Sequence, residues 1–212
     1  MNRRLSWGDR LIAVFDQGLR TLAAAPAPAR PSPASDAVEP RLSRGERRRS
    51  EALMRVNHAG EVAAQALYTG QALLARTAST RRRLDTAAAE ERDHLAWCET
   101  RLAELGGRKS ALAPFWYAGS VCIGAAAAAF GDSTSLGFVS ETEKQVEAHI
   151  KDHLQKLPAA DSKSRSILER MAQDEAHHGT TARAAGGADL PAPVRRTMRV
   201  GGEVLRRTAY FL

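Results

Sequence analysis

Two stretches of the chain carry the same order of acidic residues and histidine. In each stretch one glutamate comes first, and a Glu-x-x-His pair begins 30 residues later in the first copy and 32 residues later in the second. The six residues are Glu61, Glu91 and His94, then Glu143, Glu175 and His178. Four carboxylates and two imidazoles in this arrangement form the ligand set of a carboxylate-bridged di-iron site inside a four-helix bundle.

The neighbours of the two Glu-x-x-His pairs indicate that they point into a core. Residues three apart on a helix project from one face, so each pair can reach one metal centre. The helical neighbours are small or apolar: Leu84, Ala87, Ala88, Leu95 and Cys98 around Glu91, and Leu168, Met171, Ala172, Gly179 and Ala182 around Glu175. A carboxylate in such surroundings needs a cation or another partner to offset the cost of burial. A single pair is typical of a solvated helix, whereas the duplication on apolar faces favours a metal site.

Nearby acidic residues offer other choices in two places. Glu141 and Glu147 flank Glu143, and spacing alone does not choose among the three. In the second copy, Asp174 and His177 form a rival pair displaced by one residue. We disfavour that pair because the apolar neighbours centre on the residue that follows Asp174.

Four helical patterns can position these residues. We expect helices over residues 45–75, 81–105, 134–157 and 163–185, with Gly-Gly pairs ending the second and the fourth, and no run of residues resembles a strand. The fold class is therefore all-α, a ferritin-like four-helix bundle with additional interfacial or amphipathic helices. The bundle domain occupies residues 43–212. An amphipathic helix (residues 1–24) and an Ala/Pro-rich linker (residues 25–42), too poor in large apolar residues to build core, precede it.

Three further segments could pack on the bundle or lie on a membrane. The first carries Leu11, Ile12, Phe15, Leu19 and Leu22 at helical spacing, and we expect it to pack on the bundle, with a partner or a membrane surface as the alternatives. Residues 110–131 contain no charged residue. They are rich in Ala and Gly, which contribute little to insertion, and this favours a buried or interfacial helix over a membrane span.

The third segment is the C-terminal stretch, residues 194–212. An apolar stripe consists of Val194, Met198, Gly201, Leu205, Ala209 and Leu212, and five arginines lie mostly off it: Arg195, Arg196, Arg199, Arg206 and Arg207. This pattern is typical of a basic amphipathic helix that lies on a membrane, although a helix that packs on the core would show the same stripe.

Composition narrows the class of protein. A chain of 212 residues can form one domain with a substantial core. Its net charge of +7 favours an anionic partner, either a membrane surface or a nucleic acid, but no basic motif interleaved with aromatic residues supports nucleic-acid binding. The two cysteines, Cys98 and Cys122, lack Cys-x-x-Cys spacing, which argues against a disulfide framework or a zinc-thiolate site and fits a reducing compartment.

Four motifs carry a resemblance to a known family. They are LMRVNHAGEVAAQALYTGQ around Glu61, EERDHLAWC around Glu91, FVSETEKQVEAHI around Glu143 and QDEAHHGTTA around Glu175. From about residue 43 to the C-terminus the chain resembles the demethoxyubiquinone hydroxylases, the di-iron ring hydroxylases of ubiquinone biosynthesis.

The resemblance implies a role for each of the six residues. Glu91 and Glu175 bridge two iron ions; Glu61 and His94 complete the ligands of one ion, and Glu143 and His178 those of the other. The family pattern thereby selects Glu143 over its acidic neighbours. Tyr68 and His149 lie near ligands on their helices and are candidates for hydrogen bonding to them, with an ordinary core position as the alternative for each. His58 and His153 receive no role.

The resemblance also implies the reaction and the partners. The substrate is a demethoxyubiquinol with a polyprenyl tail, dioxygen supplies the new hydroxyl oxygen, and NADH supplies the electrons. The enzyme would lie on the cytoplasmic face of the cell membrane as a peripheral protein, alone, as a homo-oligomer or in a biosynthetic complex. Carboxylate-rich ligation suits iron or manganese rather than copper.

Other functions on the same scaffold stay open. A tRNA hydroxylase would also suit the positive charge, and a manganese catalase is a further alternative. From a different class, the chain could be a ferritin-like iron-binding or storage protein, or a lipid-binding partner of a biosynthetic complex. Storage is disfavoured because this basic chain lacks acidic iron channels.

Overall fold

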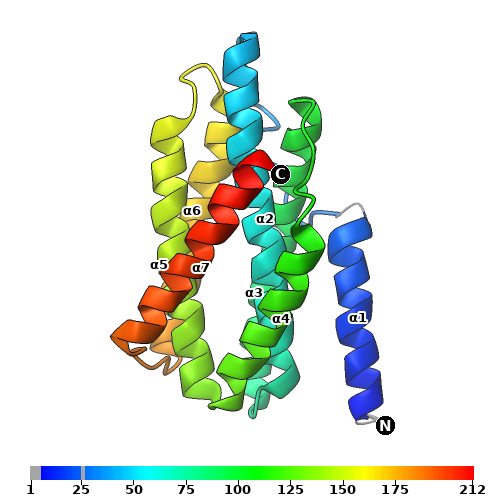
Figure 1. Ribbon diagram of the computed structural model, residues 1–212, viewed down its shortest axis with the longest axis vertical. Coiled ribbons are helices and arrows are strands. Elements are labelled where there is room, and N and C mark those ends of the chain that lie inside the picture. Colours follow the sequence, from blue (N-terminus) through cyan, green and yellow to red (C-terminus); the bar gives the residue numbers. More distant parts are fainter. Residues whose placement is uncertain (1–5, 25–26) are drawn as a thin grey trace.

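A computed structural model describes residues 6–24 and 27–212, and within these ranges it contains seven helices and no strand. The four bundle helices are α2 (Arg44–Leu74), α3 (Ala78–Glu104), α5 (Asp132–Lys156) and α6 (Ser162–Ala184). They run alongside one another (Figure 1), with α3 beside α2 and α6, and α5 beside α6 and α2. Each begins and ends within three residues of its predicted bounds. The all-α fold class predicted from the sequence is confirmed.

Local signals in the sequence account for the ends of these helices. At the start of α2, Ser43 accepts a hydrogen bond from the backbone of Glu46, whose carboxylate accepts one from the backbone of Ser43. This reciprocal capping satisfies two otherwise unpaired N–H groups. The carboxylate of Asp161 caps α6 by accepting from the Ser164 backbone at 2.9 Å. After α3, Gly106 has a φ of 72°, which a residue without a side chain adopts at little cost.

Two of the remaining helices cover one side of the bundle. Helices α4 (Ala113–Ala129) and α7 (Ala192–Phe211) both contact α2 and α5, and α7 crosses in front of them in Figure 1. The residues that α4 turns toward α2 are small. A Cβ atom at Gly70 would lie 2.1 Å from the Val121 carbonyl oxygen, and one at Gly124 would lie 2.2 Å from that of Leu67. The uncharged segment is therefore a helix packed closely on the bundle by one face.

The outer faces of α4 and of the N-terminal helix α1 (Trp7–Ala23) are apolar. Phe115 and Ile123 on α4 are exposed, as is Phe130, which directly follows the helix. Helix α1 contacts α2 and α4, with Gly18 and Thr21 buried, while five large apolar residues are exposed: Trp7, Leu11, Ile12, Phe15 and Leu19. The expectation that the apolar stripe of α1 packs on the bundle is therefore wrong for Leu11, Ile12, Phe15 and Leu19, whereas Leu22 is partly buried and packs against the core. Residues 1–5 and 25–26 of the predicted helix and linker lie outside the described residues.

Residues 27–42, which follow α1, lie along the bundle instead of hanging away from it. Arg30 pairs with Asp93 of α3 and Asp174 of α6, and Glu39 pairs with Arg101 of α3. Ala34 and Leu42 pack against the core. The segment thus runs along the seam between α3 and α6, on the side of the bundle away from α4 and α7. Composition gave no sign of these contacts.

Candidate metal centre

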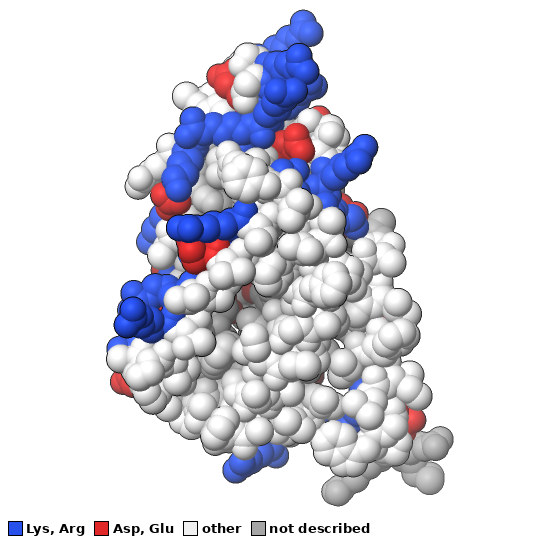
Figure 2. All heavy atoms as spheres, in the orientation of Figure 1, with Lys and Arg blue, Asp and Glu red and all other residues white. Residues whose placement is uncertain are grey.

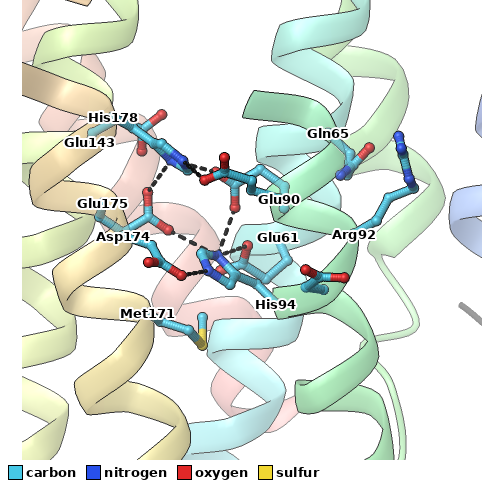
Figure 3. Close-up of polar contacts among 12 residues, drawn as sticks. Glu61, Gln65, Glu90, Arg92, His94, Glu143, Met171, Asp174, Glu175 and His178 are labelled. Carbon is cyan, nitrogen blue, oxygen red and sulfur yellow. Dashed lines mark hydrogen bonds and ion pairs between the residues drawn. The ribbon is translucent and has the colours of Figure 1, made fainter. Parts of the chain in front are cut away.

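The structure brings the six predicted residues together in the middle of the bundle. Glu61 comes from α2, Glu91 and His94 from α3, Glu143 from α5, and Glu175 and His178 from α6, and all six are buried. Figure 3 shows five of them, Glu61, His94, Glu143, Glu175 and His178, converging between the helices. Four of them, Glu61, Glu91, His94 and Glu175, offer side-chain atoms that all lie within 4.8 Å of one another. Their role as ligands remains a prediction.

Glu91 and Glu175 lie between the two imidazoles. The two oxygens of Glu91 lie 2.9 Å from Nδ1 of His94 and 3.1 Å from Nδ1 of His178. Those of Glu175 lie 3.4 and 3.7 Å from the same two nitrogens. Each carboxylate therefore presents one oxygen to each histidine. Glu61 belongs to one side, with Oε2 3.6 Å from Nδ1 of His94.

The donor atoms of this cluster suit cations. Four buried atoms make no hydrogen bond of acceptable geometry among the described residues, although two of them, Glu91 Oε1 and His178 Nδ1, lie close to each other: Glu61 Oε2, Glu91 Oε1, Glu175 Oε2 and His178 Nδ1. A buried polar atom without a partner costs on the order of 1–3 kcal/mol, so several in one cluster call for an occupant. Carboxylate oxygens with a few imidazole nitrogens are the donors that iron and manganese accept. The residues present fit such ions.

The pKa values of the clustered residues also indicate a site that suits cations. Burial, together with the neighbouring carboxylates, raises the pKa of Glu61 and Glu143 well above the ordinary value for glutamate. Burial opposes protonation of His178, but Glu175 and Glu91 raise its pKa to about 12. The pKa of His94 is also raised well above its ordinary value by its carboxylate neighbours, against the effect of burial. Without a cation, the four carboxylates are therefore balanced by protons, which bound cations would displace.

A second carboxylate holds the outer nitrogen of each histidine. Nε2 of His94 lies 3.0 Å from Asp174 on α6, and Nε2 of His178 lies 2.7 Å from Glu90 on α3. The arrangement is reciprocal, because each helix supplies the carboxylate for the histidine of the other. Such a partner fixes the ring and leaves Nδ1 free to face the centre. Neither role was predicted from the sequence, although an acidic residue precedes the Glu of each Glu-x-x-His pair.

The alternative registers do not meet at the centre. Glu141 accepts a hydrogen bond from Gln145 at 2.6 Å, and Glu147 pairs with Lys151 on the outside of α5. In the rival pair, Asp174 contacts His94 but His177 is exposed, so the two residues do not face the same site. Of the three glutamates on α5, only Glu143 is buried.

The two candidates for hydrogen bonding to ligands have different outcomes. Tyr68 donates a hydrogen bond to Glu143, and burial beside this carboxylate raises the pKa of the phenol well above its ordinary value. His149 contacts no predicted ligand among the described residues; its Nε2 lies 3.3 Å from Asn57, which also bonds His153 at 3.1 Å. The prediction for Tyr68 is confirmed, and His149 has the alternative role, an ordinary core position.

A cavity of about 350 Å³ opens beside the His178 side of the centre. Its inner wall includes Tyr68, Leu84 and Val139, and Glu90 and His178 also line it. Arg82 and Arg83, both exposed, line it as well. The cavity therefore lies in the part of the α3–α6 seam that residues 27–42 leave uncovered.

Comparison with known proteins gives consistent matches over nearly the whole chain. The family model described as ubiquinone biosynthesis protein COQ7 matches residues 48–209. Several curated relatives carry the name 3-demethoxyubiquinol 3-hydroxylase. The protein from Nitrosomonas eutropha is 53% identical over 96% of this chain and 98% of its own length. That from Nitrosococcus oceani is 54% identical over 99% of both chains, and that from Ralstonia pickettii is 51% identical over 95% and 98%.

Proposed function

Because the chain belongs to the family of the ubiquinone biosynthesis protein COQ7, we propose that it hydroxylates the ring of a demethoxyubiquinol. A ring carbon that bears hydrogen takes one atom of dioxygen as a hydroxyl group. The other atom leaves as water, with two electrons and two protons from a reductant, for which NADH is our candidate. The observation that carries the proposal is the buried cluster in which Glu91 and Glu175 each face both histidines.

The six clustered residues would hold two iron ions. Glu91 and Glu175 are placed to bridge, since each turns one oxygen to either side. Glu61 and His94 would complete one site, and Glu143 and His178 the other. Iron bound there would supply electrons to dioxygen. The surrounding protein buries the six side chains, and Tyr68 holds Glu143 in place by its hydrogen bond.

We place the entrance for the substrate on the side of the bundle covered by α4 and α7. Glu61 and Glu143 come from α2 and α5, the two bundle helices that α4 and α7 contact. Figure 2 shows a broad area without charged residues over this side, with Lys and Arg gathered at its margins. None of the helices described is both long and apolar enough to span a membrane. A peripheral position at the cytoplasmic face of the cell membrane, with the apolar faces of α1 and α4 against the lipid, would bring a polyprenyl tail to this side.

The reaction can be tested directly. Iron-loaded protein is incubated without oxygen with a short-chain demethoxyquinol, dioxygen is added, and the products are analysed by mass spectrometry. We expect a product heavier by one oxygen atom, with ¹⁸O incorporated from ¹⁸O₂. Absence of that product from a preparation that binds iron would contradict the proposed activity. Recovery of RNA with the purified protein would favour the tRNA hydroxylase alternative.

The membrane face can be tested with one substitution and a matched control. Ile123→Asp places a charge on the exposed face of α4, and we expect binding to phosphatidylglycerol-containing vesicles to weaken roughly ten-fold, because an apolar contact of this size is worth ~1.5 kcal/mol. Iron binding should be unchanged, since no predicted ligand lies on α4. Gln173→Asp adds the same charge to an exposed position on α6 and serves as the control. Equal vesicle binding by all three proteins would contradict the assignment of this face.

A further inference from the structure

Arg30 is the residue of the segment 27–42 whose side chain reaches the carboxylates beside the proposed metal centre. Its Nε lies 2.6 Å from Asp93 and its Nη1 lies 2.8 Å from Asp174. The guanidinium also lies over the ring of Trp97, 4.9 Å from the ring centroid. The planar fork of arginine can hold two carboxylates at once in a fixed geometry, which the single ammonium group of lysine does not reproduce.

The two carboxylates that Arg30 holds belong to different helices. Asp93 is on α3, directly before His94, and Asp174 is on α6. Arg30 therefore connects α3 and α6 at the level of His94. The backbone N–H of Ala29 also donates to Asp93 at 2.6 Å, which anchors the segment at the same point.

The oxygen of Asp174 that Arg30 contacts is the same oxygen that lies 3.0 Å from Nε2 of His94. Arg170, one turn earlier on α6, contacts both oxygens of Asp174 at 3.1 and 3.3 Å from a half-exposed position. If Arg170 were its only partner, the Asp174 carboxylate could turn toward solvent, because Arg170 lies on the same helix. Arg30 holds it against α3, where His94 lies.

From these contacts we propose that Arg30 is a positioning residue for His94 and acts through Asp174. It keeps the Asp174 oxygen in line with Nε2 of His94, so that the ring keeps Nδ1 turned toward Glu61, Glu91 and Glu175. Arg30 touches none of the six clustered residues itself. The inference rests on the proposed metal centre and assigns a task in it to the segment before the bundle.

The test measures Co(II) binding to metal-free protein by anaerobic titration followed by absorption. Wild-type protein should bind two ions, and His94→Ala identifies the step that belongs to the ion at His94. In Arg30→Gln we expect that step to weaken by roughly 10- to 100-fold, the usual cost of losing an outer partner of a ligand. The other step should stay as in the wild type. Arg30→Lys keeps the positive charge but not the planar fork, and its Co(II) affinity at that step should lie between those of the wild type and Arg30→Gln.

Glu39→Gln is the matched control. It removes the negative charge that the same segment presents to Arg101, at a contact of 2.5 Å that lies about two turns along α3 from His94. If Arg30 only fastened the segment to the bundle, Glu39→Gln would weaken Co(II) binding as much as Arg30→Gln does, and the proposal would be overturned. Unchanged binding in Arg30→Gln, or in Arg30→Lys if the glutamine variant does not fold, would overturn it as well. A wild-type protein that binds no Co(II) would overturn the metal centre itself, so the two failures are distinguishable.

Discussion

The two sides of the proposed centre use the same residue types in very different surroundings. His94 is paired with Asp174, whose side chain is 10% exposed and is held by Arg30 and Arg170. His178 is paired with Glu90, whose side chain is 38% exposed and lines the open cavity. No arginine or lysine pairs with Glu90 among the described residues. The sequence repeat supplied two equivalent sets of predicted ligands, whereas the rest of the chain braced the side of His94 and left the side of His178 open.

Because of this difference, we expect the two sides to bind their ions with different affinity. On the braced side, the outer carboxylate is held by Arg30 from the segment before the bundle and by Arg170 from one turn earlier on the same helix. On the open side, water from the cavity can replace the contact between Glu90 and His178. We therefore expect the ion at His94 to bind more tightly and the ion at His178 to exchange more readily.

The largest effect should come from a residue that both sides share. Glu175 faces both histidines, so Glu175→Ala should abolish tight binding of both ions and the hydroxylase activity together. Iron content per chain after anaerobic loading and desalting measures the first, and product formation measures the second. Loss of only one ion would show that the two sides are independent, and full iron content would remove Glu175 from the centre.

Glu141→Ala is the control for that experiment. Its carboxylate bonds Gln145 on the outer part of α5, away from the cluster. A surface change of this kind is usually worth within ~0.5 kcal/mol, so iron content and activity should stay close to those of the wild type. A strong loss would mean that α5 presents a different register to the centre.

A smaller effect should separate the two sides from each other. Asp174→Asn and Glu90→Gln each replace an outer carboxylate by the amide of the same size. We expect Asp174→Asn to weaken Fe(II) binding by roughly 10- to 100-fold, as is usual for such partners, because its buried position offers no substitute. Glu90→Gln should have a clearly smaller effect, since solvent reaches this pair. Anaerobic titration of both variants measures the difference, and equal effects would contradict the comparison.

The bundle and its cluster could be predicted from the sequence, but the difference between the braced and the open side could not. The four bundle helices and their six clustered residues follow from periodicity and from an i, i+3 spacing that local geometry enforces. Spacing alone does not choose Glu143 over Glu141. Side chains two residues apart on a helix point in directions that differ by more than half a turn, but packing decides which of them faces the centre. The resemblance supplied that choice.

The unpredicted part depends on contacts between residues distant in the chain. Arg30 lies 63 positions before Asp93 and 144 before Asp174, in a segment whose composition indicated a linker. Nothing in a run of Ala, Pro and Ser specifies a path along the α3–α6 seam. Exposure of the apolar stripe on α1 was also missed, since an amphipathic pattern says which residues share a face but not what that face meets.

A second pair of imidazoles, outside the centre, provides a reference for the two at the centre. His149 and His153 contact Asn57 and each other, and no carboxylate bonds either of them among the described residues. Burial lowers the pKa of His153 to about 4, whereas carboxylates raise those of His94 and His178.

His153 takes up a proton below about pH 6.5 in the unfolded chain, but only near pH 4 in the folded protein. Unfolding is therefore favoured as the pH falls through this window. His153→Gln removes the group, so relative to its own value at pH 7.5 the variant should gain about 1.4 kcal/mol over the wild type at pH 5.5. Urea denaturation of both proteins at the two pH values measures the gain, with His177→Gln at an exposed position as the control. If the difference in unfolding free energy between wild type and variant is the same at both pH values, His153 is already protonated in the folded protein. Burial without a carboxylate would then not distinguish these imidazoles from those of the centre.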